Sequence, residues 1–174
     1  MSDLSFNNFI YQTKYVLNKR GFEEIIDRNI LFSMKDNFNN LNIEENSDVA
    51  LDHNSFITEG NVFITHATTK TVKYLKERYT DYDGKKFYVI SKVYRNDNKS
   101  KKHLKEFTQL DLIYITDKQQ ALVDELKFLM YELGLNIIDR DIKFNSTYFP
   151  FTYASNEFYI NDIELAGYGI LLDS

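Results

Sequence analysis

Three segments of the chain have apolar residues every three or four positions, as on one face of an α-helix. These segments are residues 5–19, 68–79 and 117–134, and we expect each to form an amphipathic helix. Gly21 follows the first segment, and glycine is suited to the left-handed backbone that ends many helices. Asp117 and Gln120 open the third segment with a spacing similar to that of a capping box.

Other segments carry the patterns of β-strands. Residues 87–94 are apolar on both faces, which predicts a strand in a sheet that is buried on both sides. Residues 107–115 alternate between apolar and polar, which predicts a strand with one polar face. Strands in runs, with a few helices, favour an α+β fold in which helices flank an antiparallel β-sheet. Further strands are expected at residues 142–148, 157–161 and 163–170. Residues 36–61 are polar and expected to be irregular, with short apolar islands such as residues 49–51.

The two central strands carry the most informative chemistry. Arg95 stands where the first strand leaves the sheet, and Phe107, Gln109 and Asp111 share the polar face of the second. A cation, an aromatic ring, an amide and a carboxylate on one rigid hairpin suit a small charged molecule with a planar base. The same pattern also fits a hairpin with one solvated face, and pattern alone leaves both interpretations open.

Composition narrows the class of protein. The chain has 174 residues, and we expect residues 1–174 to form a single domain. Its 43% hydrophobic and 27% charged content is that of a folded globular protein. The sequence has no Cys, which excludes disulfides and thiolate metal sites and fits a reducing cytoplasm. No apolar run approaches the ~18 residues of a membrane span, and we expect no signal peptide.

The charge of the chain bears on nucleic-acid binding. A net charge of −5 gives no general attraction to a phosphate backbone. RNA contact would therefore have to be local, at a cluster of lysines that equally suits a solubilising loop. The cluster consists of Lys99, Lys101, Lys102 and Lys105.

Several stretches match the signature of a known family. Residues 95–97 read Arg-Asn-Asp, and residues 103–111 read His-Leu-Lys-Glu-Phe-Thr-Gln-Leu-Asp. Together they resemble motif 2 of class II aminoacyl-tRNA synthetases. Residues 65–69 and 147–152 are similar to segments that precede and follow motif 2 in phenylalanyl-tRNA synthetase α subunits. The chain thus resembles that α subunit, with pyrrolysyl-tRNA synthetase as a near relative, over residues 6–170.

The resemblance implies a ligase that binds ATP and Mg²⁺. Arg95 matches the catalytic arginine that grips the α-phosphate of ATP and the substrate carboxylate, and stabilises the charge of adenylation. Phe107 matches the ring that stacks on adenine, Asp97 the acid at the adenine edge, and His103 the histidine near the outer phosphates. Without the resemblance, Arg95 would be expected to form a surface ion pair with a nearby acid. Phe107 would be expected to pack in the core, and His103 to be an ordinary surface residue of the loop.

The resemblance also implies a pocket for phenylalanine or another aromatic amino acid. Gln109 and Asp111 match the pair that holds the α-amino group, although glutamate is usual at the second position and Asp111 is shorter. Phe149 and Phe151 flank Pro150, which fixes the local backbone, and match rings that recognise an aromatic side chain.

Four more residues match positions of the family. His66 and Thr68 match positions beside the amino-acid pocket, but Thr68 could equally be the N-cap of the following helix. Glu157 and Glu164 match acids of later strands that could help to bind Mg²⁺ with phosphate oxygens.

One expected motif is missing. Motif 3, Gly-x-Gly-x-Glu-Arg, does not occur in the 174 residues, so we expect a truncated class II catalytic domain whose unaided activity is in doubt. Three functions stay open. The first is an amino-acid-activating enzyme of the phenylalanyl-tRNA synthetase type, or a fragment of one, with or without a partner chain that completes it. The others are a non-catalytic paralogue that binds an amino acid or regulates, and an interaction protein that keeps only the fold. The resemblance implies three kinds of partner in the cytoplasm: an amino acid, tRNA, and a second synthetase-type chain. That chain would be another copy, bound through the helix of residues 5–19 as in the family, or a different protein.

Overall fold

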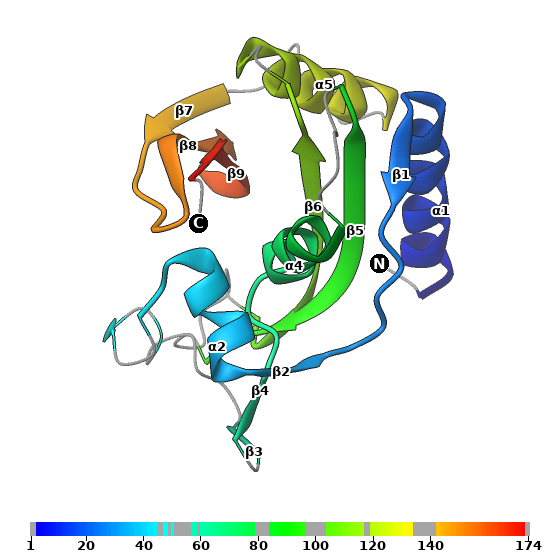
Figure 1. The fold of residues 1–174 in the computed structure, drawn as a ribbon. Helices are drawn as coiled ribbons and strands as arrows, with labels where there is room; N and C mark the ends of the chain where they lie inside the picture. The colour runs from blue at the N-terminus through cyan, green and yellow to red at the C-terminus, as the bar shows by residue number, and fades with distance from the viewer. Residues whose placement is uncertain are drawn as a thin grey trace.

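The part of the chain that the structure describes forms three small β-sheets and the helices that pack on them (Figure 1). The structure, a computed structural model, describes residues 3–44, 47, 48, 50, 57, 58, 60–78, 84–96, 104–116, 119–133 and 142–172. Among these residues each sheet has three strands, and all but one of the strand pairs are antiparallel. The predicted α+β fold with antiparallel strands flanked by helices is confirmed, although the strands are divided among three sheets.

The first sheet contains the two central strands. β5 (Lys86–Tyr94) and β6 (Glu106–Tyr114) pair antiparallel along their whole length. β1 (Phe22–Glu24) lies on the other side of β5 and runs parallel to it. The register places Val89 opposite Asp111. Because side chains alternate across a strand, the polar residues of β6 that were expected to share a face do so.

Helices cover both faces of this first sheet. On one face lies α4 (Thr68–Arg78), whose Tyr74 packs against the cluster formed by β5 and β6. On the other face, α1 (Asp3–Lys19) and α5 (Gln119–Glu132) pack around the fully buried Tyr88. Figure 1 shows α1 beside β1, away from α4 and the third sheet. This burial on both sides explains why β5 is apolar on both faces.

The segment that was expected to be irregular holds part of the core. It contains the end of α2 (Met34–Asn37) and the 3₁₀ helix η1 (Asn39–Leu41). The second sheet follows the order β2 (Leu31–Ser33), β4 (Asn61–Phe63), β3 (Ile57–Thr58). The prediction was wrong for the described part, because such short helical turns bury single residues without a repeating pattern. The buried apolar residues here are Phe38, Leu41, Ile43 and Ala50.

The third sheet is an antiparallel meander near the C-terminus. Its strands are β7 (Ile142–Ser146), β8 (Thr152–Ile160) and β9 (Ile163–Leu171). Asn161 and Asp162 form the turn between β8 and β9 with φ values of 50° and 62°. Both values lie in the left-handed region that a type I′ hairpin turn requires. The predicted turn is confirmed, whereas β8 begins earlier than the predicted strand.

The predicted helices agree closely with the observed ones. Gly21 has a φ of 79°, and its N–H donates to the carbonyl of Asn18, so it ends the first helix as expected. Asp117 lies outside the described residues, so its predicted capping role stays a prediction. None of the helices that the structure describes is long and apolar enough to span a membrane.

Candidate functional site

Arg95 is held at the end of β5 by two backbone contacts. Its own N–H donates to the carbonyl of Lys105 across the hairpin at 3.0 Å. Its Nε donates to the carbonyl of Thr65 at 2.9 Å. The guanidinium carbon lies 5.2 Å from the centroid of the Phe107 ring, within range of a cation–π contact. The hydrogen bond through Nε fixes the plane of the guanidinium, and a planar fork suits carboxylate and phosphate oxygens.

Asp111 is bonded to the first turn of α4. Its Oδ1 accepts a hydrogen bond from the Thr68 hydroxyl at 2.7 Å, and its Oδ2 accepts one from the Thr71 hydroxyl at 2.6 Å. Burial raises the pKa of Asp111 above its ordinary value of 3.8, and the two threonine hydrogen bonds oppose that rise. A carboxylate has about four lone-pair sites, so two hydroxyl donors leave capacity for a further donor such as an ammonium.

The residues that precede α4 bind the same strand. Gln109 Oε1 accepts from the backbone N–H of Ala67 at 2.9 Å. The helix begins at Thr68, so this bond satisfies a donor that the helix itself leaves unpaired. Thr68 is therefore not the N-cap, and its hydroxyl bonds Asp111 instead. Of the two interpretations of Thr68 in the sequence, the capping role is wrong.

Asn37 supports this arrangement through Thr65, and no role for it was predicted from the sequence. Its side chain bonds Thr65 twice: the Thr65 N–H donates to Oδ1 at 3.2 Å, and Nδ2 donates to the Thr65 hydroxyl at 3.0 Å. The same hydroxyl lies 2.9 Å from Nδ1 of His66. A single asparagine in a polar segment gives no pattern from which this role could be predicted.

The aromatic residues form a row that ends at His66. The rings of Phe149 and Phe151 are stacked, with centroids 5.9 Å apart and planes at 16°. Phe151 meets the His66 ring edge-on at 6.0 Å. Gly167 of β9 lies under Phe149, because a Cβ built on this glycine would be 2.6 Å from Cζ of the ring. Glycine at this position therefore lets the ring lie directly on the strand backbone.

Comparison with known proteins identifies the family. Residues 3–174 match the family described as tRNA synthetases class II core domain (F). The chain belongs to this family. It is 30% identical to the phenylalanine–tRNA ligase alpha subunit of Ureaplasma parvum, over 87% of this chain and 45% of that protein. It is 27% identical to that of Saccharolobus solfataricus, over 95% of this chain and 42% of that protein. The chain thus spans less than half the length of these relatives.

Solved structures agree on the fold of this class II core. The pyrrolysyl-tRNA synthetase of Desulfitobacterium hafniense superimposes with a TM-score of 0.71 at 16% identity, covering 92% of this chain and 57% of that one. A likeness at this identity shows the fold alone. The resemblance stated from the sequence, to class II synthetases and to the phenylalanine alpha subunit, is confirmed.

The predicted site residues of the class II core fall into three groups. One group lies where β5 and β6 meet the start of α4, and a second lies on the row of aromatic rings that joins it. Asp97 and His103 lie outside the described residues, so their predicted roles stay predictions. The first group is Arg95, Phe107, Gln109, Asp111 and Thr68, and the second is Phe149 and Phe151. His66 meets the Phe151 ring edge-on and lies within hydrogen-bond distance of Thr65, whose carbonyl holds Arg95.

The third group, Glu157 and Glu164, lies on the third sheet. Glu157 accepts hydrogen bonds from the Tyr159 hydroxyl at 2.6 Å and from the Thr147 hydroxyl at 3.3 Å. The hydrogen bond to Glu157 raises the pKa of Tyr159 to about 12, with smaller contributions from burial and from the charges of Glu157 and Glu164. The described residues contain no group of three metal-ligating side chains. The predicted Mg²⁺ role of both glutamates stays a prediction.

Proposed function

We propose that this class II core binds phenylalanine, or a closely related aromatic amino acid, together with ATP. In this proposal it forms the aminoacyl adenylate and supports the charging of tRNA. The observation that carries the proposal is the convergence of Arg95 and Asp111 on the start of α4, one through Thr65 and the other through Thr68. The site therefore holds a fixed cation and a fixed carboxylate on a rigid frame.

Opposite charges at fixed positions suit an amino acid. The ammonium group of the ligand would pair with Asp111, and its carboxylate with the guanidinium of Arg95. An ammonium beside Asp111 would also oppose the effect of burial and lower the pKa of the carboxyl. Binding of the amino acid is therefore expected to favour the charged form of Asp111.

Arg95 is also suited to the chemical step. In adenylation, an oxygen of the amino-acid carboxylate attacks the α-phosphorus of ATP, and the bond from that phosphorus to the pyrophosphate leaving group breaks. Negative charge develops on the oxygens around the α-phosphorus. The guanidinium, already oriented by Thr65, would stabilise that charge without reorganising. Phe107, beneath the guanidinium, offers a ring on which adenine could stack.

The aromatic row favours an aromatic side chain as substrate. The rings of Phe149 and Phe151 provide a flat apolar surface, and the edge-on contact with His66 joins that surface to the polar site. Aromatic pairs of this kind contribute about 1 kcal/mol beyond burial. The names of the relatives, phenylalanine–tRNA ligase alpha subunits, support the same assignment.

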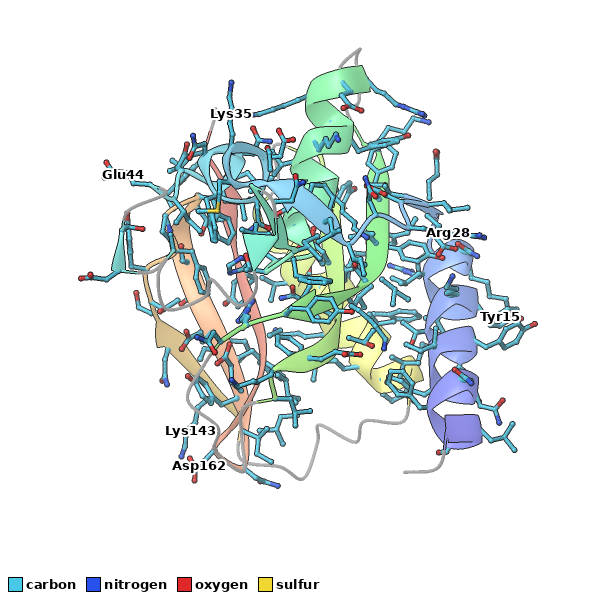
Figure 2. The ribbon with its side chains drawn as sticks, turned by 90° about the horizontal axis from the view of Figure 1, so that it is seen from below. Tyr15, Arg28, Lys35, Glu44, Lys143 and Asp162 are labelled. Atoms are coloured by element: carbon cyan, nitrogen blue, oxygen red, sulfur yellow. The ribbon has the colours of Figure 1, made fainter. Side chains whose placement is uncertain are left out.

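The surface of α1 supports a second protein as partner. Leu4 and Tyr11 are 74% and 73% exposed, and Tyr15 is 52% exposed, on one outward face of the helix. Figure 2 shows Tyr15 pointing away from the rest of the molecule. Such an apolar face is typical of an interaction surface. We propose that it binds a second copy or another synthetase-type chain, and sedimentation of wild type against Tyr11→Glu tests this.

The direct test is phenylalanine-dependent exchange of pyrophosphate into ATP. Wild type is expected to catalyse exchange, alone or with a partner chain, and Arg95→Ala is expected to lower the rate at least about a hundredfold. Arg28→Ala is the matched control, because Arg28 is exposed on another part of the surface (Figure 2). Binding of phenylalanine without exchange would indicate a non-catalytic paralogue, and binding of neither ligand would indicate an interaction protein.

A further inference from the structure

Asn37 is a completely buried polar residue that the proposed chemistry does not use. It ends α2, and its exposed fraction is 0%. A buried amide needs hydrogen-bond partners, and both ends of this one bond the same residue, Thr65. Thr65 in turn holds Arg95 through its carbonyl and contacts His66 through its hydroxyl. Two residues of the candidate site therefore depend on one threonine, and that threonine depends on Asn37.

The direction of the hydrogen bonds through Thr65 follows from the backbone. The Thr65 N–H can only donate, so the atom of Asn37 that faces it at 3.2 Å is the oxygen Oδ1. The nitrogen Nδ2 must then face the Thr65 hydroxyl, at 3.0 Å, and donate to it. The amide orientation is thus fixed by a group whose role is certain, and the hydroxyl oxygen is an acceptor.

The proton of the Thr65 hydroxyl then has one destination. Thr65 is fully buried, with an exposed fraction of 0%, so solvent does not accept this proton. Within the part of the chain that the structure describes, the acceptor in reach of the hydroxyl is Nδ1 of His66, at 2.9 Å. An imidazole nitrogen that accepts carries no proton, so the neutral ring carries its proton on Nε2.

We propose that Asn37 is a positioning residue that fixes His66, through Thr65, as the tautomer protonated on Nε2. The part of this proposal that concerns ligands rests on the proposed function. A ligand group that meets Nε2 must then be an acceptor, such as a carboxylate or carbonyl oxygen. The ammonium group of an amino acid cannot take that place, so it is directed to Asp111. The Asn37–Thr65 contact thus sets which end of the amino acid lies at His66.

The first test reads the tautomer directly and needs no ligand. The chain has 3 His, so the ring nitrogens can be assigned by nitrogen NMR with a His66→Gln variant. Wild type is expected to show Nδ1 unprotonated and Nε2 protonated. Asn37→Ala frees the Thr65 hydroxyl to rotate, so a mixture of tautomers is expected. A wild-type ring protonated on Nδ1, or an unchanged ring in a folded Asn37→Ala variant, would overturn the proposal.

Further variants separate the hydrogen-bond relay from a general loss of structure. Asn40→Ala is the matched control, since Asn40 lies one turn further along the chain and bonds the Asp36 carbonyl rather than Thr65. The His66 tautomer in this variant should be the same as in wild type. Thr65→Ser keeps the hydroxyl and should keep the His66 tautomer. Thr65→Val removes the hydroxyl, so the His66 tautomer should change. Equal tautomers in the serine and valine variants would contradict the relay, whatever Asn37→Ala does.

A second test uses two ligands that differ only in the carboxylate. The Asn37→Ala change is expected to weaken the binding of phenylalanine by about tenfold. It should leave the binding of phenethylamine, which has no carboxylate, almost unchanged. Equal weakening of both ligands would contradict the assignment of the acceptor to His66. If wild type binds neither ligand, the proposed function fails, while the tautomer experiment still decides the role of Asn37.

Discussion

Asp111 connects the chemistry of the site to the stability of the fold. Its carboxylate is buried against α4, and two hydroxyl groups are its hydrogen-bond donors. The net effect of burial is a pKa above the ordinary value of 3.8. A raised pKa means that the charged form is less stable in the folded state than in the unfolded chain. The contribution of this group to stability is therefore present below pH 3.8 and is lost as the pH rises through the folded pKa.

Asp111→Asn should separate stability from ligand binding. The amide carries no charge, so the free energy of unfolding of the variant relative to wild type should increase as the pH rises above about 4. The variant also cannot attract an ammonium, so its affinity for phenylalanine should fall at least about tenfold. Urea denaturation at several pH values and calorimetry measure the two effects. A stability difference that does not change with pH, or unchanged affinity, would contradict this account.

At the residue scale, the sequence predicts side-chain faces better than hydrogen-bond partners. Alternation along β6 places Gln109 and Asp111 on one face, and the structure agrees. Their partners in α4 and before it could not be predicted, because they depend on how a helix distant in sequence docks on the strand. Thr71 and Asn37 are the clearest cases, since neither belongs to a recognisable pattern.

The strands of the third sheet show how one element shapes another. Gly167 of β9 has no side chain, and the ring of Phe149 occupies the space that a Cβ would fill. Phe149 is stacked on Phe151, so a change under the first ring is passed to the second. The positions of both rings therefore depend on β9, which contacts the aromatic row through a glycine that has no side chain.

Gly167→Ala should displace the Phe149 ring. The new Cβ would lie 2.6 Å from Cζ, which is too close for van der Waals contact. We expect a loss of about 1–3 kcal/mol in the free energy of unfolding, measured by urea denaturation, and weaker binding of phenylalanine.

The double variant Gly167→Ala/Phe149→Leu provides the control. Leucine is smaller than phenylalanine and leaves room for the new methyl group, so the effects on stability should not add. Additive effects would show that the glycine does not act through the ring.

At the element scale, elements with a regular hydrophobic period could be predicted from the sequence, whereas short irregular elements could not. The helix α4 and the hairpin of β5 and β6 were predicted within a few residues, because each repeats its pattern over several turns or residue pairs. α2 and η1 were missed, since a single turn of helix has too few residues to establish a period.

At the scale of the whole molecule, one ionic cluster joins three elements behind the site. Glu125 of α5 accepts from Arg20, which follows α1, at 2.9 Å and 3.0 Å, and from Lys86 of β5 at 2.5 Å. Burial alone would raise the pKa of Glu125, but these hydrogen bonds outweigh it and lower the pKa. This contribution to stability is therefore present above pH 4.5 and is lost as the pH falls through the folded pKa.

Glu125→Gln should weaken the packing of α1 and α5 on the first sheet. Removing the charge leaves two cations without their acid, and Arg20 is partly exposed, so we expect a loss of about 2 kcal/mol at pH 7. The difference from wild type should shrink as the pH falls below about 4.5. Glu44→Gln, at an exposed glutamate outside this cluster, is the control in urea denaturation. A loss that stays constant down to acidic pH would argue against an ionic origin.

The central claim is that this class II core holds an amino acid and ATP around Arg95. Calorimetric titration of phenylalanine into the protein, in the presence of ATP, tests it most directly. We predict saturable binding to wild type that Arg95→Ala abolishes and Arg28→Ala retains. Absence of binding to wild type, or equal binding to the Arg95→Ala variant, would contradict the claim.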